Sequence, residues 1–327
     1  MDLELASRLT GRKREAWIGF LAQAGLEADE NVQTTALVWE DGRLVAAGSR
    51  QDNVLKCIAV DPAHQGEGLT ATLLTALRQD ATARGYRHLF LYTKPRNKTM
   101  FSSLFFYPVT QTDQVLLMES RKSGAQEFVD SLDAPGKGVV GAAVMNCNPF
   151  TRGHRYLIET AARACDWLYV FVLSEEKSLF PAADRLTLVR AGTADIPNVT
   201  VHPTGPYLIS SATFPTYFLK EKDQFARIHC QLDIEVFVRY FVPRFGISRR
   251  YVGTEPLSPV TAQYNEALRR FLPPRGVELV EIPRIESGEL PISASAVRGL
   301  LGTRQPELLR KLVPESTFAY LKEKDMI

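Results

Sequence analysis

The feature that most constrains this chain is a short turn between an apolar run and an amphipathic helical pattern. Residues 139–144 are apolar, and residues 157–165 carry apolar side chains at helical spacing. The turn contains Pro149 and Gly153, which interrupt regular structure. This order predicts a strand, a tight turn and a helix whose N-terminal N–H groups and positive dipole end suit a phosphate.

His154 lies in the first turn of the expected helix. The helix dipole disfavours an imidazolium there, so we expect a neutral ring that hydrogen-bonds an anion. Gly153 lets backbone approach a ligand closely because it has no Cβ. The alternative is a plain strand-to-helix turn with a surface histidine.

The same turn resembles the T/H-x-G-H signature of the nucleotidyltransferase superfamily. Thr151, Gly153 and His154 stand on the motif positions, and Asn148 stands where relatives such as phosphopantetheine adenylyltransferase have aspartate. The resemblance implies a nucleotide site. Because Thr151 replaces the first histidine, a hydroxyl would make that phosphate contact.

Length and composition narrow the class of protein. A chain of 327 residues with 45% hydrophobic and 23% charged residues predicts two compact domains with ordinary cores. The net charge of +2 provides no broad basic field, so we expect no nucleic-acid partner. No stretch reaches the roughly 18 apolar residues of a membrane span. Four scattered cysteines suggest neither zinc nor disulfides, so we expect a protein of the reducing cytoplasm: Cys57, Cys147, Cys165 and Cys230.

The N-terminal half predicts a small mixed domain over residues 1–134. A helical pattern lies within the first 30 residues, and residues 34–39 and 44–48 form a hairpin pattern around an Asp-Gly turn. A third strand at 54–60 precedes a loop with Gln65, Gly66 and Gly68, then a helix and a strand at 88–93. Such a loop is a second candidate phosphate cradle, and a plain connection is its alternative.

This half resembles the GNAT acetyltransferases. Gln65 and Gly68 match the loop that holds the pyrophosphate of coenzyme A in that family, whereas Thr70 departs from its last small position. Phe101 stands where many members have a tyrosine general acid, and Phe105 replaces a glycine. A phenyl ring has no proton to give, so we expect a GNAT-like α+β fold with a groove for a pantetheine-like arm, without ordinary acetyltransferase chemistry.

The second domain is expected over residues 135–327, after a segment in which the patterns fade. Strand-like and helical patterns alternate in it, which predicts a Rossmann-like parallel sheet wrapped by helices. Ligands of such sheets gather at the carboxyl ends of the strands. The expected strands are 167–173, 199–202, 250–253 and 277–282, and the expected helices are 182–194, 216–229, 234–240 and 261–271.

Two loops in this domain follow predicted strands. Lys177 resembles the lysine that contacts phosphates at the second strand end of nucleotidyltransferases, and a solvated lysine is its alternative. Gly253 ends another strand, where backbone groups could read an adenine edge. Glu255 could bind ribose or a metal there; an ordinary proline-rich loop is the competing interpretation.

A late segment resembles the I-S-S-T-x-x-R signature of the same superfamily. Ser293 or Ser295 would cap the helix that follows, and Arg298 would direct its guanidinium at the β and γ phosphates. A serine cap alone is common. Two signatures at predicted helix starts, early and late in one α/β domain, together indicate an HxGH-type nucleotidyltransferase site.

The combination of a GNAT-like domain with these signatures resembles the citrate lyase ligase family over nearly the whole chain. The segments that carry this resemblance are residues 148–157, 251–256 and 258–261. It implies an enzyme that uses ATP, with Mg²⁺ on its triphosphate, and acetate to acetylate the thiol of the citrate lyase prosthetic group. AMP and pyrophosphate would be released, and the acceptor would be a dephospho-coenzyme A derivative on the acyl-carrier subunit.

Three other functions are compatible with the same residues. An adenylyltransferase of the phosphopantetheine type would keep AMP on a stable product. A GNAT acetyltransferase with an accessory ATP domain would consume acetyl-coenzyme A without ATP, and Phe101 argues against it. A nucleotide-sensing or carrier-binding regulator would bind ATP without releasing pyrophosphate.

Overall fold

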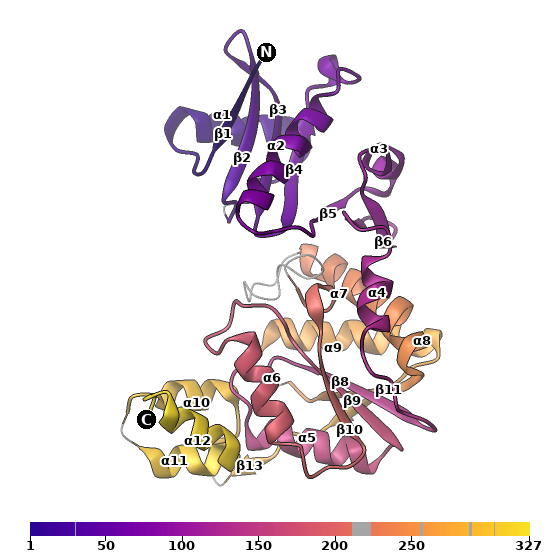
Figure 1. Ribbon diagram of the computed structural model, residues 1–327, viewed down its shortest axis with the longest axis vertical. Coiled ribbons are helices and arrows are strands. Elements are labelled where there is room, and N and C mark those ends of the chain that lie inside the picture. Colours follow the sequence, from indigo (N-terminus) through magenta and orange to yellow (C-terminus); the bar gives the residue numbers. More distant parts are fainter. Residues whose placement is uncertain (30, 211–223, 256–257, 288–289, 304) are drawn as a thin grey trace. The chain divides into compact units, whose positions relative to one another are not determined.

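The computed structural model describes residues 1–327 except 30, 211–223, 256–257, 288–289 and 304. Contacts divide the chain into two compact units, Met1–Gly124 and Ala125–Ile327 (Figure 1). Helix α4 (Gly124–Asp130) belongs mainly to the second unit because the Phe128 ring packs 5.4 Å from that of Tyr207 and Arg244 donates to the Val129 carbonyl. The division therefore lies about ten residues before the boundary expected from sequence.

The first unit contains a seven-stranded sheet in the order β1-β2-β3-β4-β5-β7-β6. Neighbouring strands are antiparallel except β4 and β5, which run parallel and pair only at Val54–Phe90 and Leu55–Leu91. Beyond Leu55, β4 makes no further pair with β5 in the described residues. The strands are β1 (Asp2–Ala6), β2 (Thr34–Glu40), β3 (Arg43–Gln51), β4 (Val54–Val60), β5 (Phe90–Thr93), β6 (Tyr107–Gln111) and β7 (Leu116–Glu119).

Successive side chains of a strand point to opposite faces of the sheet, so both faces present apolar side chains. One helix covers each face. Helix α1 (Gly11–Gln23) packs Trp17 and Leu21 against the face that includes Leu37. Helix α2 (Leu69–Ala83) packs Leu73 against the face that includes Ala36. A short helix, α3 (Lys98–Ser103), follows β5. The predicted hairpin and the strand at 54–60 are present as expected, whereas β1 was not predicted.

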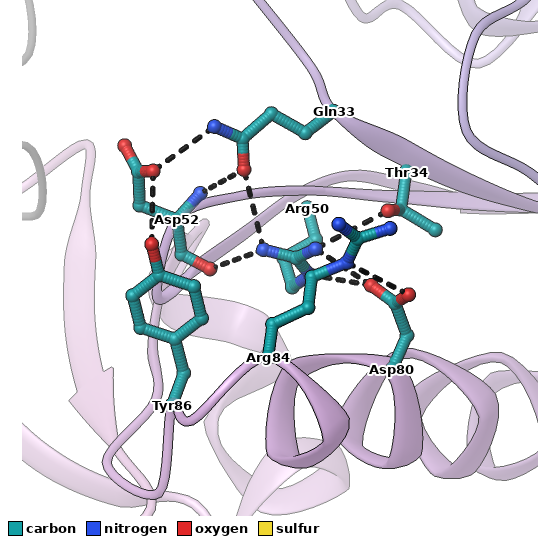
Figure 2. A network of polar contacts seen from close by, with 7 residues as sticks. All are labelled: Gln33, Thr34, Arg50, Asp52, Asp80, Arg84 and Tyr86. Atoms are coloured by element: carbon teal, nitrogen blue, oxygen red, sulfur yellow. Dashed lines mark hydrogen bonds and ion pairs between the residues drawn. The ribbon is translucent and has the colours of Figure 1, made fainter.

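A buried arginine ties β3 to α2 in the first unit. Arg50 is fully buried, and its Nε and Nη2 donate to one Asp80 oxygen at 2.9 and 2.6 Å (Figure 2). Its Nη1 donates to the Asp52 carbonyl at 2.6 Å. Further partners are the Gln33 and Thr34 oxygens and the ring of Tyr86. Because its partners surround it, this charge is buried at a tolerable cost.

The second unit contains a five-stranded parallel sheet in the order β10-β9-β8-β11-β12. This agrees with the parallel sheet expected from the alternating pattern. The strands are β8 (Val140–Met145), β9 (Trp167–Val172), β10 (Val199–Pro203), β11 (Ile247–Gly253) and β12 (Glu278–Ile282). A two-stranded ribbon of β13 (Glu286–Ser287) and β14 (Leu290–Pro291) follows.

Helices pack on both faces of the parallel sheet. Helices α5 (Arg152–Arg163) and α6 (Ala182–Ala191) cover the face that includes Tyr251. The opposite face, with Phe171, is covered by α7 (Gln224–Val236), a π-helical turn (Phe237–Phe241), α8 (Val242–Phe245) and α9 (Pro259–Phe271). Figure 1 shows α5 and α9 on opposite sides of the strands. Of the helix expected at 216–229, residues 216–223 lie outside the described residues.

Three short helices follow the sheet and share a small core of their own. They are α10 (Ala294–Leu300), α11 (Pro306–Leu312) and α12 (Glu315–Glu323). Val297, Leu309 and Phe318 meet in this core. Within the described residues, each helix is too short or too polar to cross a membrane.

Candidate active site

The turn after β8 closes on itself at the start of α5. Thr151 is the N-cap residue, and its Oγ1 accepts a hydrogen bond from the backbone N–H of His154 at 3.3 Å. In return, the Thr151 N–H donates to His154 Nδ1 at 3.1 Å. This reciprocal capping box satisfies two donors that would otherwise lack partners. It also fixes the orientation of the imidazole.

The capping box sets which ring nitrogen of His154 carries the proton, and burial keeps the ring neutral. Nδ1 accepts the Thr151 N–H, so the proton of the neutral ring lies on Nε2, which remains a donor. Burial, with a smaller effect of the Arg284 charge, lowers the pKa of His154 to about 4. The ring stacks 6.0 Å from that of Phe150. His154 is therefore a neutral Nε2–H donor at neutral pH, as the sequence led us to expect.

The late signature meets the early one at this turn. Ser293 caps α10 by accepting the Ala296 N–H at 3.1 Å, and Ser295 is exposed one turn before Arg298. Arg298 donates from Nη1 to the Asn148 carbonyl at 2.5 Å and from Nη2 to Ser295 Oγ at 2.9 Å. The structure thus brings Arg298 against the turn that holds Thr151 and His154.

Gly153 explains how the two segments come so close. A Cβ at this position would lie 2.9 Å from the Ile292 carbonyl oxygen and 3.4 Å from Ile292 Cγ2. Any larger residue would push the late segment away from α5. The space that we assigned from sequence to an approaching ligand is filled here by the chain's own backbone.

A buried arginine that was not among the predicted site residues holds the turn after β8 in place. Arg185, on α6, is fully buried and donates to the carbonyls of Asn146, Glu175 and Phe180. Its Nη1 also contacts the Asn146 side chain at 2.6 Å. The Asn148 side chain accepts the Phe180 N–H at 3.0 Å. Arg185 therefore joins the turn after β8 to the loop after β9.

The remaining sequence-predicted residues of this unit lie at other strand ends. Lys177 is exposed in the loop between β9 and α6. Gly253 ends β11, and its carbonyl accepts from Asn265 Nδ2 at 3.0 Å. Glu255 accepts the Ser258 N–H at 3.0 Å and pairs with Arg284.

Arg284 is a second residue that sequence reasoning missed. It follows β12 closely, donates from Nε to the Thr254 carbonyl at 2.8 Å, and lies near enough to His154 to disfavour its protonation. Its position just beyond the carboxyl end of a parallel strand was the available signal. Among the described residues, no group of three or more His, Cys, Asp or Glu side chains is arranged to hold a metal ion.

The predicted loop of the first unit has the form expected for a strand-to-helix cradle. Gln65 follows a single 3₁₀ turn (Pro62–His64), and Gly68, with φ of +79°, directly precedes α2. Both residues are exposed. Phe101 is buried, and Phe105 has φ of +61°, in the left-handed region where a glycine is normally favoured.

These observations define the class of protein as a GNAT-type α+β domain followed by a Rossmann-like parallel-sheet domain with two converging helix starts. Family models agree. The model described as the citrate lyase ligase C-terminal domain matches residues 140–321, and the acetyltransferase (GNAT) family model matches residues 5–102.

Similarity to individual proteins extends this result to almost the whole chain. The [citrate [pro-3S]-lyase] ligase of Escherichia coli K12 is 43% identical over 93% of this chain and 88% of its own length. That of Klebsiella pneumoniae is 42% identical over 95% of this chain and 93% of its own. Among solved structures, Escherichia coli ElaA matches 37% of this chain and all of its own, with 17% identity and a TM-score of 0.32. The chain belongs to the citrate lyase ligase family, which is a family of enzymes.

Proposed function

We propose that this enzyme is an ATP-dependent, AMP-forming ligase. It activates acetate as acetyl-adenylate and then acetylates the thiol of the citrate lyase prosthetic group. The observation that carries this proposal is the contact of Arg298 with the Asn148 carbonyl, because it unites two anion-binding signatures in one site. The family membership supplies the substrate classes.

In the first step, a carboxylate oxygen of acetate attacks the α-phosphorus of ATP, and the bond to the β-phosphate oxygen breaks. Pyrophosphate leaves with that electron pair. Acetate is already an anion at neutral pH, so the step needs no general base and depends on positioning and charge stabilisation. His154 Nε2–H, Arg298 and Lys177 supply donors and charge for the phosphates. Thr151 holds His154 in the donating tautomer and is the candidate hydroxyl for a further contact.

Other residues position the nucleotide. Gly253 and Glu255 lie at the end of β11, where they would face the adenosine. Asn148 and Gly153 shape the turn below the phosphates, and Ser293 and Ser295 flank the start of α10. Mg²⁺ would bind mainly through phosphate oxygens of ATP, as is usual for this ion, and would neutralise charge on the leaving pyrophosphate.

In the second step, the thiol sulfur attacks the acetyl carbonyl carbon, the bond to the phosphate oxygen breaks, and AMP leaves. The thiol proton is released to solvent. The acceptor is the long arm, derived from dephospho-coenzyme A, on the acyl-carrier subunit of citrate lyase. The exposed Gln65 and Gly68 loop of the first unit would help to hold this arm. A thiol acceptor and four free cysteines suit the cytoplasm. Neither nucleic acid nor a membrane takes part.

The decisive experiment is exchange of labelled pyrophosphate into ATP with acetate, propionate, phosphopantetheine or no second substrate. We expect exchange only when a short carboxylic acid is present, with acetate the best. Exchange with phosphopantetheine alone would instead indicate an adenylyltransferase. ATP binding without any exchange would indicate a regulator.

A further inference from the structure

Arg250 is a charged residue inside the second unit that the site described above does not use. It lies in the middle of β11, and only 2% of it is exposed. Its neighbour Tyr251 faces α5, so strand alternation turns Arg250 to the opposite face, beneath the π-helical turn. There its guanidinium lies 4.8 Å from the centre of the Phe237 ring.

The guanidinium of Arg250 makes no hydrogen bond and no ion pair within the part of the chain that the structure describes. Nε and Nη1 are both buried without an acceptor. Arginine stays protonated in proteins, so a charge and its donors are buried together. Leaving such donors unsatisfied is costly, and a native structure normally supplies a partner, water or ion. Arg50, also buried, shows the contrast because its donors are satisfied.

The carboxylate whose charge acts on Arg250 already accepts hydrogen bonds from other groups. Asp233, on α7, accepts the Ile209 N–H at 2.6 Å and the Tyr264 hydroxyl at 2.7 Å. Its charge acts on Arg250 only through space. Ile209 has φ of +45°, a strained conformation for a β-branched residue. Asp233 is thus held by the Ile209 N–H and the Tyr264 hydroxyl. The buried donors of Arg250 are therefore suited to a bound anion that is not part of the chain.

Arg250 belongs to the same strand as the candidate nucleotide-binding end. Gly253, three residues further along β11, is held by Asn265 of α9. The adjacent α9 residue, Tyr264, forms the hydroxyl contact with Asp233. At about 3.3 Å per residue, Arg250 starts about 10 Å below the strand end, and an arginine side chain can span much of that distance.

We propose that Arg250 binds the carboxylate of the small acid substrate. This inference rests on the proposed function, because that function supplies a short carboxylic acid. A guanidinium matches a carboxylate with two parallel N–H donors, and the deep burial of Arg250 favours the smallest carboxylic acids over larger ones. Arg250 is then the residue that selects a small carboxylate, distinct from the phosphate-binding His154 and Arg298.

Two measurements on the full chain test the role of Arg250. The first is the thermal shift caused by sodium acetate, compared with sodium chloride, with and without a non-hydrolysable ATP analogue. The second is the pyrophosphate-exchange KM for acetate and for ATP. The variants are Arg250→Met, Arg250→Lys and, as a control, Arg249→Met, which removes a neighbouring arginine that pairs with Glu278.

We expect acetate to raise the Tm of the wild type and the Arg249→Met variant more than chloride does, and to leave that of Arg250→Met unchanged. The acetate KM of Arg250→Met should rise roughly 30- to 100-fold while its ATP KM stays within about twofold. Arg250→Lys should fall between. Without acetate, Arg250→Met should be at least as stable as the wild type because an unpaired charge is gone.

Three results would overturn the assignment. An unchanged acetate KM in Arg250→Met would mean that water alone solvates the arginine. Equal shifts with chloride and acetate would indicate an unspecific anion. A fall in Tm with a parallel rise of both KM values would indicate a structural residue. Should no exchange occur in the wild type, an acetate-specific shift lost only in the Arg250 variants would still support a carboxylate site, while the proposed function would fail.

Discussion

Thr151 and His154 exchange two hydrogen bonds: the Thr151 hydroxyl accepts from the backbone N–H of His154, and His154 Nδ1 accepts from the backbone N–H of Thr151 at 3.1 Å. The exchange fixes which ring nitrogen carries the proton, because Nδ1 has no room for one while it accepts. Nε2–H is therefore a permanent donor at neutral pH.

The pH dependence of stability follows from this arrangement. Burial lowers the pKa of His154 from its ordinary 6.5 to about 4 in the folded protein. Between these values the unfolded chain binds the proton and the folded one does not, so stability falls as pH drops from about 6.5 to 4. The unfolding free energy of the wild type, minus that of His154→Gln, should decline in this window and stay level above about pH 7. A difference that stays constant across the whole range would contradict it.

The Nε2–H donor itself can be tested by substitution. We expect His154→Ala to lower acetate-dependent pyrophosphate exchange about 10²- to 10³-fold, since one preorganised donor to a developing charge is lost. His154→Gln should keep more activity because its amide places an N–H near the former Nε2. Equal losses in both variants would argue that the ring acts by packing rather than by donation.

Gly153 offers a test of whether the two signatures act together. Gly153→Ala places a Cβ 2.9 Å from the Ile292 carbonyl and should reduce exchange at least about tenfold by moving α10 and Arg298. Gly299→Ala is the matched control, since no atom lies within 4 Å of its added Cβ and α10 should gain roughly 0.4–1 kcal/mol. Loss of exchange in the control alone would refute this account of the packing.

The first unit should matter only for the second half-reaction. Gly68→Val strains a residue at φ of +79° at the start of α2 and should impair acetyl transfer to the carrier while pyrophosphate exchange continues. Gly85→Val introduces comparable strain at φ of +89°, just beyond the other end of α2. It serves as the control, and should spare transfer when both are assayed below the Tm. If exchange and transfer fell together in Gly68→Val, the loop would have no role in docking the arm.

Substitution of Arg50 should lower the stability of the first unit through a structural effect alone. Arg50→Met leaves Asp80 without its main buried partner and should destabilise the first unit by roughly 3 kcal/mol, measured by urea unfolding. Arg84, which also contacts Asp80, is more exposed, so Arg84→Met should cost less than about 1 kcal/mol. A larger loss for Arg84 than for Arg50 would reverse this ranking.

Periodicity and turn chemistry predicted much of the fold. Strand β4 was predicted at residues 54–60, and the parallel sheet followed from alternating patterns. Strand β1 was missed although its Asp2–Ala6 segment alternates charged and apolar residues, because five residues of alternation were outweighed by the helical pattern expected within the first 30 residues. Helices α11 and α12 were missed because they are short, with seven and nine residues, and so give few turns of periodic pattern.

The site was predictable where residues follow a motif and was not predictable where they act through the fold. His154 and Arg298 were found at helix starts, and the structure places both at one turn. Arg185 and Arg284 were not among the predicted site residues, because their roles depend on carbonyls supplied by other segments. The structural requirement for glycine at position 153 is visible only in the fold, where Ile292 leaves no space for a Cβ. Arg250 lies within an expected strand, and the sequence does not show that its buried donors lack acceptors.

The Arg298 to Asn148 contact joins residues 150 positions apart in the chain. During synthesis at 5–20 residues per second, roughly 8 to 30 s pass between the two residues. The turn is thus made long before the arginine that completes it. The candidate site is one of the last parts of the enzyme to form, and a chain broken off before residue 290 would hold the seven- and five-stranded sheets yet have no assembled site.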